Sequence, residues 1–197
     1  RIQRMVREKG LEPVWKKYVE ATGELSRLCY REEIEAAMRT KDLSGISLLG
    51  LQDFPGQGTA LVGMLDSHLE PKPFDFAKPE KFRAFFKEQL VLVGLEKYTY
   101  EEGETLCADV QVANYGKTDC AGDLEWTLWA YMPDEGLDSV RKVAVKSGHM
   151  SDVSCPKGTL SKAGTLKIEL NNKITAPVRC NLTVKIADAV NSYPIWI

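Results

Sequence analysis

The sequence lacks several features that would assign it to a broad functional class. No apolar stretch reaches the roughly 18–20 residues that a membrane-spanning helix needs, and the first residues do not form a basic and apolar signal peptide. The 26 basic and 28 acidic side chains nearly cancel, which leaves a net charge of −2 and no strong field that would attract nucleic acid. What remains is the composition of a globular protein, with 44% hydrophobic and 27% charged residues.

Paired metal-binding cysteines are absent as well. The five cysteines include no CxxC pair, and the two histidines, His68 and His149, are far apart in the sequence, so we expect no metal site. Alternation places Cys107 on the polar face of one predicted strand and Cys180 on the apolar face of another. The two thiols therefore point into different environments, and we expect reduced cysteines.

A phosphate-binding loop is the next absence. The segment GQGTALVG has Leu61 where a dinucleotide fingerprint needs a small residue, and it lacks the Lys-Ser/Thr ending of a nucleotide-binding loop. The chain also begins with Arg1 rather than methionine. We therefore expect no nucleotide site. From the first residue we expect an excised or processed piece of a longer protein.

The first part of the chain is predicted to be helical up to a buried strand. Residues 1–9 form the end of a helix that stops at Gly10, and a short helix that begins near Pro13 is broken at Gly23. A further amphipathic helix covers residues 24–40. The continuously apolar run at 46–51 is typical of a parallel strand that is covered on both faces. A single parallel strand cannot form a sheet alone, so its neighbours must come from elsewhere.

From about Leu90 the hydrophobic period changes to two. A Pro-punctuated connector at 67–79 and a helix at 79–89 precede this change. Turn residues separate about seven short strands, which favours an antiparallel immunoglobulin-like sandwich. The predicted strands are 90–99, 105–113, 124–131, 139–147, 164–170, 179–187 and 192–197.

The string LLGLQDFPGQGTALVG, preceded by YREEIEAAMRT, resembles the last strand and preceding helix of the catalytic barrel in a branch of family 2 glycoside hydrolases. The resemblance continues through LEKYTYEEGETL to the final NSYPIWI. It implies an α+β fragment: residues 1–88 as terminal helices and one strand of a (β/α)8 barrel, and residues 89–197 as an immunoglobulin-like sandwich. The parent enzyme would remove the terminal sugar of a β-glycoside without a cofactor, in a periplasmic or secreted setting.

Retaining glycoside hydrolysis needs two carboxylates that flank the scissile bond. The resemblance implies that both are glutamates on earlier barrel strands, and Glu32, Glu33 and Glu35 are expected on the solvated face of a helix. We therefore assign no catalytic residue to this chain and expect it to be inactive alone.

Four side chains at the carboxyl end of the predicted strand are candidates for substrate binding. Gln52, Asp53 and Gln57 could bond sugar hydroxyls, and Phe54 could pack on a sugar ring. The alternative is structural: Asp53 and Gln57 would bond nearby backbone. Many family members have a tryptophan in this strand, which this sequence lacks.

A second functional hypothesis is a non-catalytic carbohydrate-binding or interaction sandwich. Trp129 and Tyr131 share one strand face, which would either bind a sugar or be covered by the barrel, while Trp126 alternates with core leucines. A third possibility is a module whose partner is the rest of its own barrel. Apolar side chains at 46–49 and 82–86 would then be exposed in the isolated chain, which favours self-association or disorder of residues 1–88.

Overall fold

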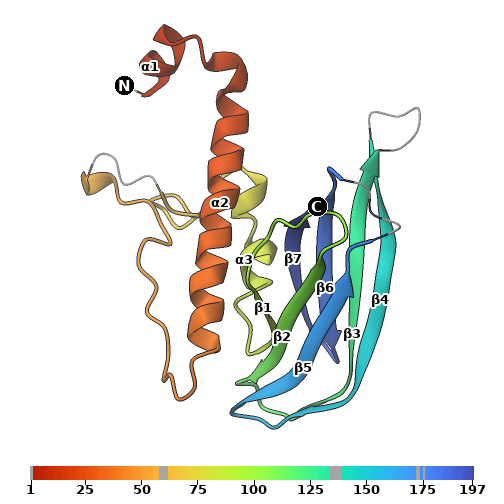
Figure 1. The fold of residues 1–197 in the computed structure, drawn as a ribbon. Coiled ribbons are helices and arrows are strands. Elements are labelled where there is room, and N and C mark those ends of the chain that lie inside the picture. The colour runs from red at the N-terminus through yellow and green to blue at the C-terminus, as the bar shows by residue number, and fades with distance from the viewer. Residues whose placement is uncertain (1, 58–61, 134–138, 172–173, 175) are drawn as a thin grey trace. The chain divides into compact units, whose positions relative to one another are not determined.

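The computed structural model describes the chain except for residues 1, 58–61, 134–138, 172–173 and 175. The chain divides into two compact units, Arg1–Phe86 and Lys87–Ile197. The described helices belong to the first unit, and the strands of two antiparallel sheets belong to the second (Figure 1). The predicted combination of helices with an antiparallel sandwich is therefore confirmed. None of the described helices is both long and apolar enough to cross a membrane.

The first helix, α1 (Ile2–Glu8), ends where the sequence predicts. Gly10 has a φ of 62°, a left-handed conformation that glycine adopts without steric cost. The Gly10 amide donates a hydrogen bond to the Arg7 carbonyl (3.0 Å), and the Leu11 amide donates to the Val6 carbonyl (2.9 Å). This pair of bonds satisfies two carbonyls at the helix end and fixes the turn into the next helix.

A single long helix follows, α2 (Glu12–Met38), and the predicted break at Gly23 is wrong. A Cβ atom on Gly23 would lie only 2.1 Å from Cε1 of Phe76. The Phe76 ring is buried and stacks on Phe74, with 5.5 Å between ring centroids and 7° between ring planes. Gly23 therefore serves the packing of an aromatic ring against the helix backbone, and it does not end the helix.

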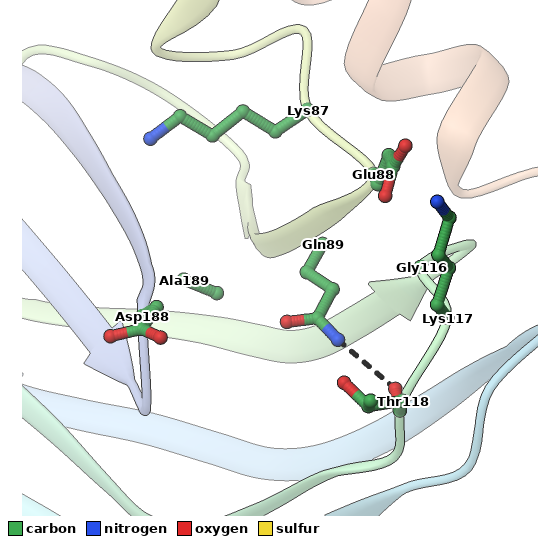
Figure 2. Close-up of a pocket in the computed structure, with 8 residues that line it drawn as sticks. All are labelled: Lys87, Glu88, Gln89, Gly116, Lys117, Thr118, Asp188 and Ala189. Atoms are coloured by element: carbon green, nitrogen blue, oxygen red, sulfur yellow. Dashed lines mark hydrogen bonds between the residues drawn. The ribbon is translucent and has the colours of Figure 1, made fainter.

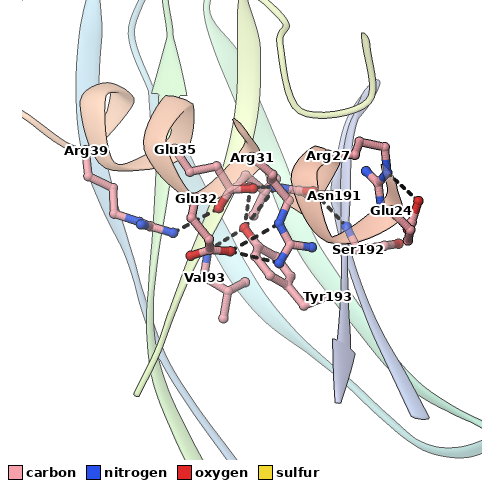
Figure 3. Close-up of polar contacts among 11 residues, drawn as sticks. Glu24, Arg27, Arg31, Glu32, Glu35, Arg39, Val93, Asn191, Ser192 and Tyr193 are labelled. Carbon is pink, nitrogen blue, oxygen red and sulfur yellow. Dashed lines mark hydrogen bonds and ion pairs between the residues drawn. The ribbon is translucent and has the colours of Figure 1, made fainter. Parts of the chain in front are cut away.

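Ion pairs along α2 include one that is withdrawn from water (Figure 3). Arg27 pairs with Glu24 at 2.6 Å, and Arg39 pairs with Glu35 at 2.9 Å. The Glu35 side chain is fully buried, so its expected place on a solvated face is wrong, whereas Glu33 is exposed as expected. A buried carboxylate requires a partner such as the Arg39 guanidinium, because an unpaired charge would lose its hydration without compensation.

The apolar run at 46–51 does not form the predicted buried strand. Ile46 is exposed and Leu49 is 94% exposed. One isolated parallel bridge, between Gln52 and Leu65, is the only ladder contact beside this run in the described residues. The reason is physical: a parallel strand obtains its hydrogen bonds from neighbouring strands, and the described part of the first unit contains none.

After α2, the described residues of the first unit contain three short helices. The last of them is shorter than the predicted 79–89, although proline occupies its first turn as expected. The Phe82 ring lies 4.9 Å from that of Phe85 and 6.2 Å from that of Phe86, so the three predicted aromatic side chains do gather. These short helices are η1 (Pro55–Gln57), η2 (Asp75–Ala77) and α3 (Pro79–Arg83).

Asp75 is expected to titrate well below an ordinary aspartate. Hydrogen bonds from the Lys78 and Lys81 ammonium groups lower the pKa of the Asp75 carboxyl from 3.8 to about 2. A depressed folded-state pKa means that the stabilisation is present above the unfolded value and is lost as the pH falls from 3.8 through about 2. The titration of the Asp75 carboxyl carbon by NMR measures this directly. Lys78→Gln should raise the midpoint, and an unchanged midpoint would contradict the ion pair.

The second unit is an antiparallel sandwich with a three-stranded and a four-stranded sheet. In the described residues each of the seven predicted strands is present, with ends shifted by up to several residues. The order of the first sheet is β1 (Gln89–Leu95), β2 (Thr105–Asn114), β5 (Thr159–Glu169). The order of the second is β4 (Val140–Cys155), β3 (Cys120–Pro133), β6 (Arg179–Ile186), β7 (Ala189–Trp196).

The longest ladder joins β3 to β4, and its register shifts twice. One shift lies between Gly122 and Leu124, and the other lies between Leu128 and Trp129. At the second shift β4 has an additional residue, Val145, because Leu128 pairs with Lys146 and Trp129 pairs with Ala144. Such bulges bend and twist a strand pair.

Alternating side chains of both sheets form one hydrophobic core. Leu124 and Leu128 of β3 are fully buried, and Trp126 packs against this core as the alternation predicts. The parity prediction for the cysteines is also confirmed, since Cys107 is exposed and Cys180 is buried. Burial raises the pKa of the Cys180 thiol to about 11, so the thiol stays protonated at neutral pH.

A buried polar cluster connects β7 with β1, which belong to different sheets (Figure 3). The Tyr193 hydroxyl accepts hydrogen bonds from the Val93 amide (3.0 Å) and from Nδ2 of Asn191 (2.8 Å). Nδ2 of Asn191 also donates to the Val91 carbonyl at 2.9 Å. The cluster therefore satisfies buried polar groups and holds the two layers together.

Candidate functional site

The loop that follows residue 51 is closed by backbone hydrogen bonds. The Asp53 amide donates to the Leu65 carbonyl, and the Leu65 amide donates to the Leu51 carbonyl, both at 3.0 Å. Gly63 lies so close that a Cβ there would be 2.4 Å from the Gln52 carbonyl carbon. The backbone on the two sides of the loop is thus in direct contact, which gives the polar side chains between them a fixed base.

Asp53 fastens this loop. Its side chain is buried, and Oδ1 accepts hydrogen bonds from the Gly63 amide and from Nζ of Lys72, both at 2.9 Å. These bonds reach 10 and 19 residues along the chain. The geometry favours the structural alternative for Asp53, because its side chain is buried and Oδ1 already has two partners within the chain.

Two of the other candidate residues are accessible. Gln52 is exposed, and the Phe54 side chain is 57% exposed, whereas the side chain of Gln57 lies outside the described residues. The Phe54 ring lies over Gly56, where a Cβ would be 2.7 Å from the ring atom Cζ. Gly56 thus lets the ring lie on the loop backbone. The structure brings Gln52, Phe54 and Gln57 onto one fastened loop, while Gly58 and residues 59–61 lie outside the described residues.

The described residues form no metal-binding cluster, and the glutamates of α2 do not form a catalytic pair. No group of three or more potential metal ligands occurs among the residues that the structure describes. The Glu35 carboxylate forms an ion pair with Arg39, and Glu33 is exposed on the same helix. His68 lies in an exposed turn of the first unit, and His149 lies on β4 opposite Glu125.

The second unit has a surface cavity of about 400 Å³ that the sequence did not reveal (Figure 2). Its wall combines the start of β1 with the β2–β3 loop and the β6–β7 turn, segments that are distant in the sequence. Two lysines, Lys87 and Lys117, oppose two carboxylates, Glu88 and Asp188. Nε2 of Gln89 is engaged by the Thr118 carbonyl at 3.1 Å. The residues that line the cavity have balanced charge and include no aromatic side chain. The lining therefore does not indicate which class of ligand would bind there.

The outer face of the four-stranded sheet carries the aromatic pair that the sequence singled out. By this face we mean the outward side chains of β4, β3, β6 and β7. Trp129 and Tyr131 are half-buried on it. Nζ of Lys142 lies 4.3 Å from the Trp129 ring centroid, and Cζ of Arg179 lies 5.2 Å from the Tyr131 centroid. Each ring therefore has a cation over it, an arrangement that strand alternation alone does not indicate.

Comparison with protein families gives one match. A family model described as a domain of unknown function, DUF8488, matches residues 104–197. These residues contain β2 to β7 of the sandwich. No curated protein matches the chain.

Solved structures with a related arrangement come from proteins of differing function. The sporulation control protein Spo0M of Bacillus subtilis is 16% identical with a TM-score of 0.41, and the match covers 56% of this chain and 49% of that one. A cycloisomaltooligosaccharide glucanotransferase of Paenibacillus sp. is 14% identical with a TM-score of 0.40, covering 53% and 13%. A β-glucosidase of Listeria innocua is 13% identical with a TM-score of 0.38, covering 55% and 16%. This chain thus spans less than half the length of each, and the comparisons assign it no activity.

Proposed function

We propose that this chain is the C-terminal portion of an exo-acting glycoside hydrolase that resembles the β-galactosidase and β-glucuronidase group. In the intact enzyme, Gln52, Phe54 and Gln57 would form one wall of the sugar pocket, with Asp53 holding the loop that carries them. Residues 89–197 would be a supporting immunoglobulin-like sandwich. Alone, the chain would be inactive because the two catalytic glutamates belong to other barrel strands.

One observation carries this proposal: backbone hydrogen bonds close the loop at its base, yet Gln52 and Phe54 remain exposed. The Gly63 amide donates to Oδ1 of Asp53 at 2.9 Å, while the side chains of Gln52 and Phe54 are exposed. Sugar sites commonly combine a few polar groups with an aromatic surface on a fixed scaffold. The loop has this composition.

The exposed run at 46–51 gives further support. Two apolar side chains of the run are exposed, Ile46 at 41% and Leu49 at 94%, and exposed apolar patches are usually covered by a partner. Such exposure is expected if the run is a barrel strand whose neighbours are on other segments. The sheet order, with β4 beside β3 in the sheet that also holds β6 and β7, is compatible with the immunoglobulin-like family of sandwiches.

The neutral-carbohydrate alternative receives less support. It requires ring faces of Trp129 and Tyr131 that are open to a sugar, but Lys142 and Arg179 lie over these rings. A neutral sugar would have to displace a cation from each ring before stacking. The loop at 52–57 has no such competitor among the described residues.

The test is hydrolysis of aryl β-galactoside, β-glucuronide, β-mannoside and β-glucoside by this chain and by a chain extended upstream through a full barrel. We expect turnover by the extended chain alone, and the preferred substrate would name the sugar. In the extended chain, Gln57→Ala should lower kcat/KM by about tenfold if the side chain binds the substrate, since tenfold corresponds to one hydrogen bond of about 1.4 kcal/mol.

Lys117→Ala in the second unit is the matched control and should leave kcat/KM unchanged. Activity of the short chain would overturn the assignment of the catalytic pair to other strands. An extended chain that folds but hydrolyses none of the four substrates would argue against the glycosidase proposal itself.

A further inference from the structure

The outer face of the sheet places aromatic and cationic side chains in one row across four strands. Tyr131 pairs in register with Lys142 on one side and with Arg179 on the other, and Arg179 pairs with Trp196. Because neighbouring strands lie about 4.8 Å apart, this row of four side chains extends over roughly 14 Å. We call these four residues, together with the adjacent Trp129, the cationic row.

The cations of this row are accessible and are held in place. Lys142 and Arg179 are exposed, and each lies over an aromatic ring. Neither forms an ion pair with a carboxylate among the described residues, whereas Lys162, on the other sheet, pairs with Asp109 at 3.4 Å. A cation that rests on a ring loses less conformational freedom when it binds an anion, which favours binding.

The row also offers apolar and hydrogen-bonding groups to a ligand. Trp196 is 42% exposed at its end. In the next register positions, Asn181 lies between Trp129 and Pro194, and Thr183 and Ser192 share a hydroxyl hydrogen bond of 3.2 Å. A ligand that fits this surface has negative charges, ring faces and many hydroxyl groups.

We propose that the cationic row binds an acidic polysaccharide, a chain that contains uronic acid residues. The sugar carboxylates would pair with Lys142 and Arg179, and a sugar ring would pack on Trp196. The cationic row belongs to the second unit and shares no residue with the loop at 52–57 of the first unit, so this proposal does not depend on the glycosidase proposal.

Nucleic acid would use similar contacts, but the charge of the chain disfavours it. Nucleic-acid-binding domains are usually strongly basic, and this chain has a net charge of −2 and a pI near 5.8. A polymer with a high density of phosphates would be repelled by the remaining surface. A uronic acid chain has fewer charges along its length and more hydroxyl groups, which match Asn181 and its neighbours.

Titration of the complete chain with oligogalacturonate, in parallel with uncharged galacto-oligosaccharide of the same length, tests the proposal. Calorimetry and tryptophan fluorescence are both suitable, because Trp129 and Trp196 belong to the site. We expect binding of the uronate, weakening of this binding as salt increases, and at least tenfold weaker binding of the uncharged oligosaccharide.

Variants locate the site. Arg179→Ala and Lys142→Ala should each weaken uronate binding by about tenfold, the effect of losing one charge-assisted hydrogen bond, and Arg179→Lys should lose less. Lys162→Ala removes an equal charge from the other sheet and should have no effect. Circular dichroism of each variant confirms that the sandwich remains folded.

Three outcomes would overturn the proposal. Equal affinity for the charged and uncharged oligosaccharides would show that the cations do not select the ligand. Stronger binding of single-stranded DNA than of uronate would assign the row to nucleic acid instead. Absence of binding to each probe at low salt would show that the row has no role in recognising polyanions.

Discussion

Tyr193→Phe is expected to lower the free energy of unfolding of the sandwich by about 1–3 kcal/mol, the usual cost of leaving buried polar groups unsatisfied. The substitution removes one oxygen atom and leaves the ring in place. The Val93 amide and Nδ2 of Asn191 would each lose one acceptor in a region where Tyr193 is fully buried. Because these groups lie on strands of different sheets, the loss acts on the association of the two layers.

Urea unfolding followed by tryptophan fluorescence measures this effect, since three of the four tryptophans lie in the second unit. Tyr115→Phe is the matched control. Its side chain is 45% exposed, so the same chemical change should alter stability by less than about 0.5 kcal/mol. Equal stability of the two variants would show that the buried cluster contributes nothing beyond packing.

Gly23→Ala is expected to destabilise the first unit by about 1–3 kcal/mol, as overpacking of a close contact does. On an exposed helix the same change would stabilise by up to about 1 kcal/mol, because alanine has the higher helix propensity. Here the new methyl group would lie 2.1 Å from a carbon of the Phe76 ring. The ring cannot move away easily, since it is buried and stacked on Phe74. The sign of the effect therefore distinguishes packing from propensity.

Far-UV circular dichroism is the appropriate measurement, because the described helices all lie in the first unit. Thr22→Ala, one position earlier on an exposed part of α2, should change stability little. In a Phe76→Leu background, where a smaller side chain faces Gly23, the cost of Gly23→Ala should fall. A stabilising effect of Gly23→Ala in the unmodified chain would refute the close contact.

The sandwich could be predicted because its determinants are local. Alternation of Leu124, Trp126 and Leu128 on one strand, and of Cys180, Leu182 and Val184 on another, marks the inward face without knowledge of the partners. The parity argument for the cysteines succeeded for the same reason. The strand ends were less certain because pairing, which sequence does not show, extends β3 and β4 beyond their hydrophobic centres.

The first unit was harder to predict because its determinants are tertiary. Gly23 looks like a helix break until Phe76, 53 positions later, is seen to occupy the space where a side chain would be. The run at 46–51 has the composition of a buried strand, but composition cannot supply neighbouring strands. The local sequence pattern thus indicated which secondary structure each segment favours. Contacts with residues distant in the sequence determined which secondary structure it adopts.

The candidate loop also has some features that local sequence predicts and others that depend on long-range contacts. The clustering of polar and glycine residues correctly indicated a loop after residue 51. It could not show that Asp53 has a structural role, because that role depends on Lys72, which is 19 residues away and whose ammonium group donates to Asp53. The cations over Trp129 and Tyr131 were missed for a related reason, since Lys142 and Arg179 come from neighbouring strands. Only the sheet register brings them over the rings.

The irregular ladder between β3 and β4 has a consequence for aggregation. β4 forms one border of its sheet and is 16 residues long, so a flat β4 would offer unpaired amides and carbonyls to a strand of another molecule. The additional residue Val145 bends β4 in the middle, and Lys142 and Lys146 place charges on either side of the bend. An incoming strand would have to follow this bend and bury lysine charges. The bulge that shifts the register thereby disfavours pairing of β4 with a strand of another molecule, and so disfavours a continuous sheet between molecules.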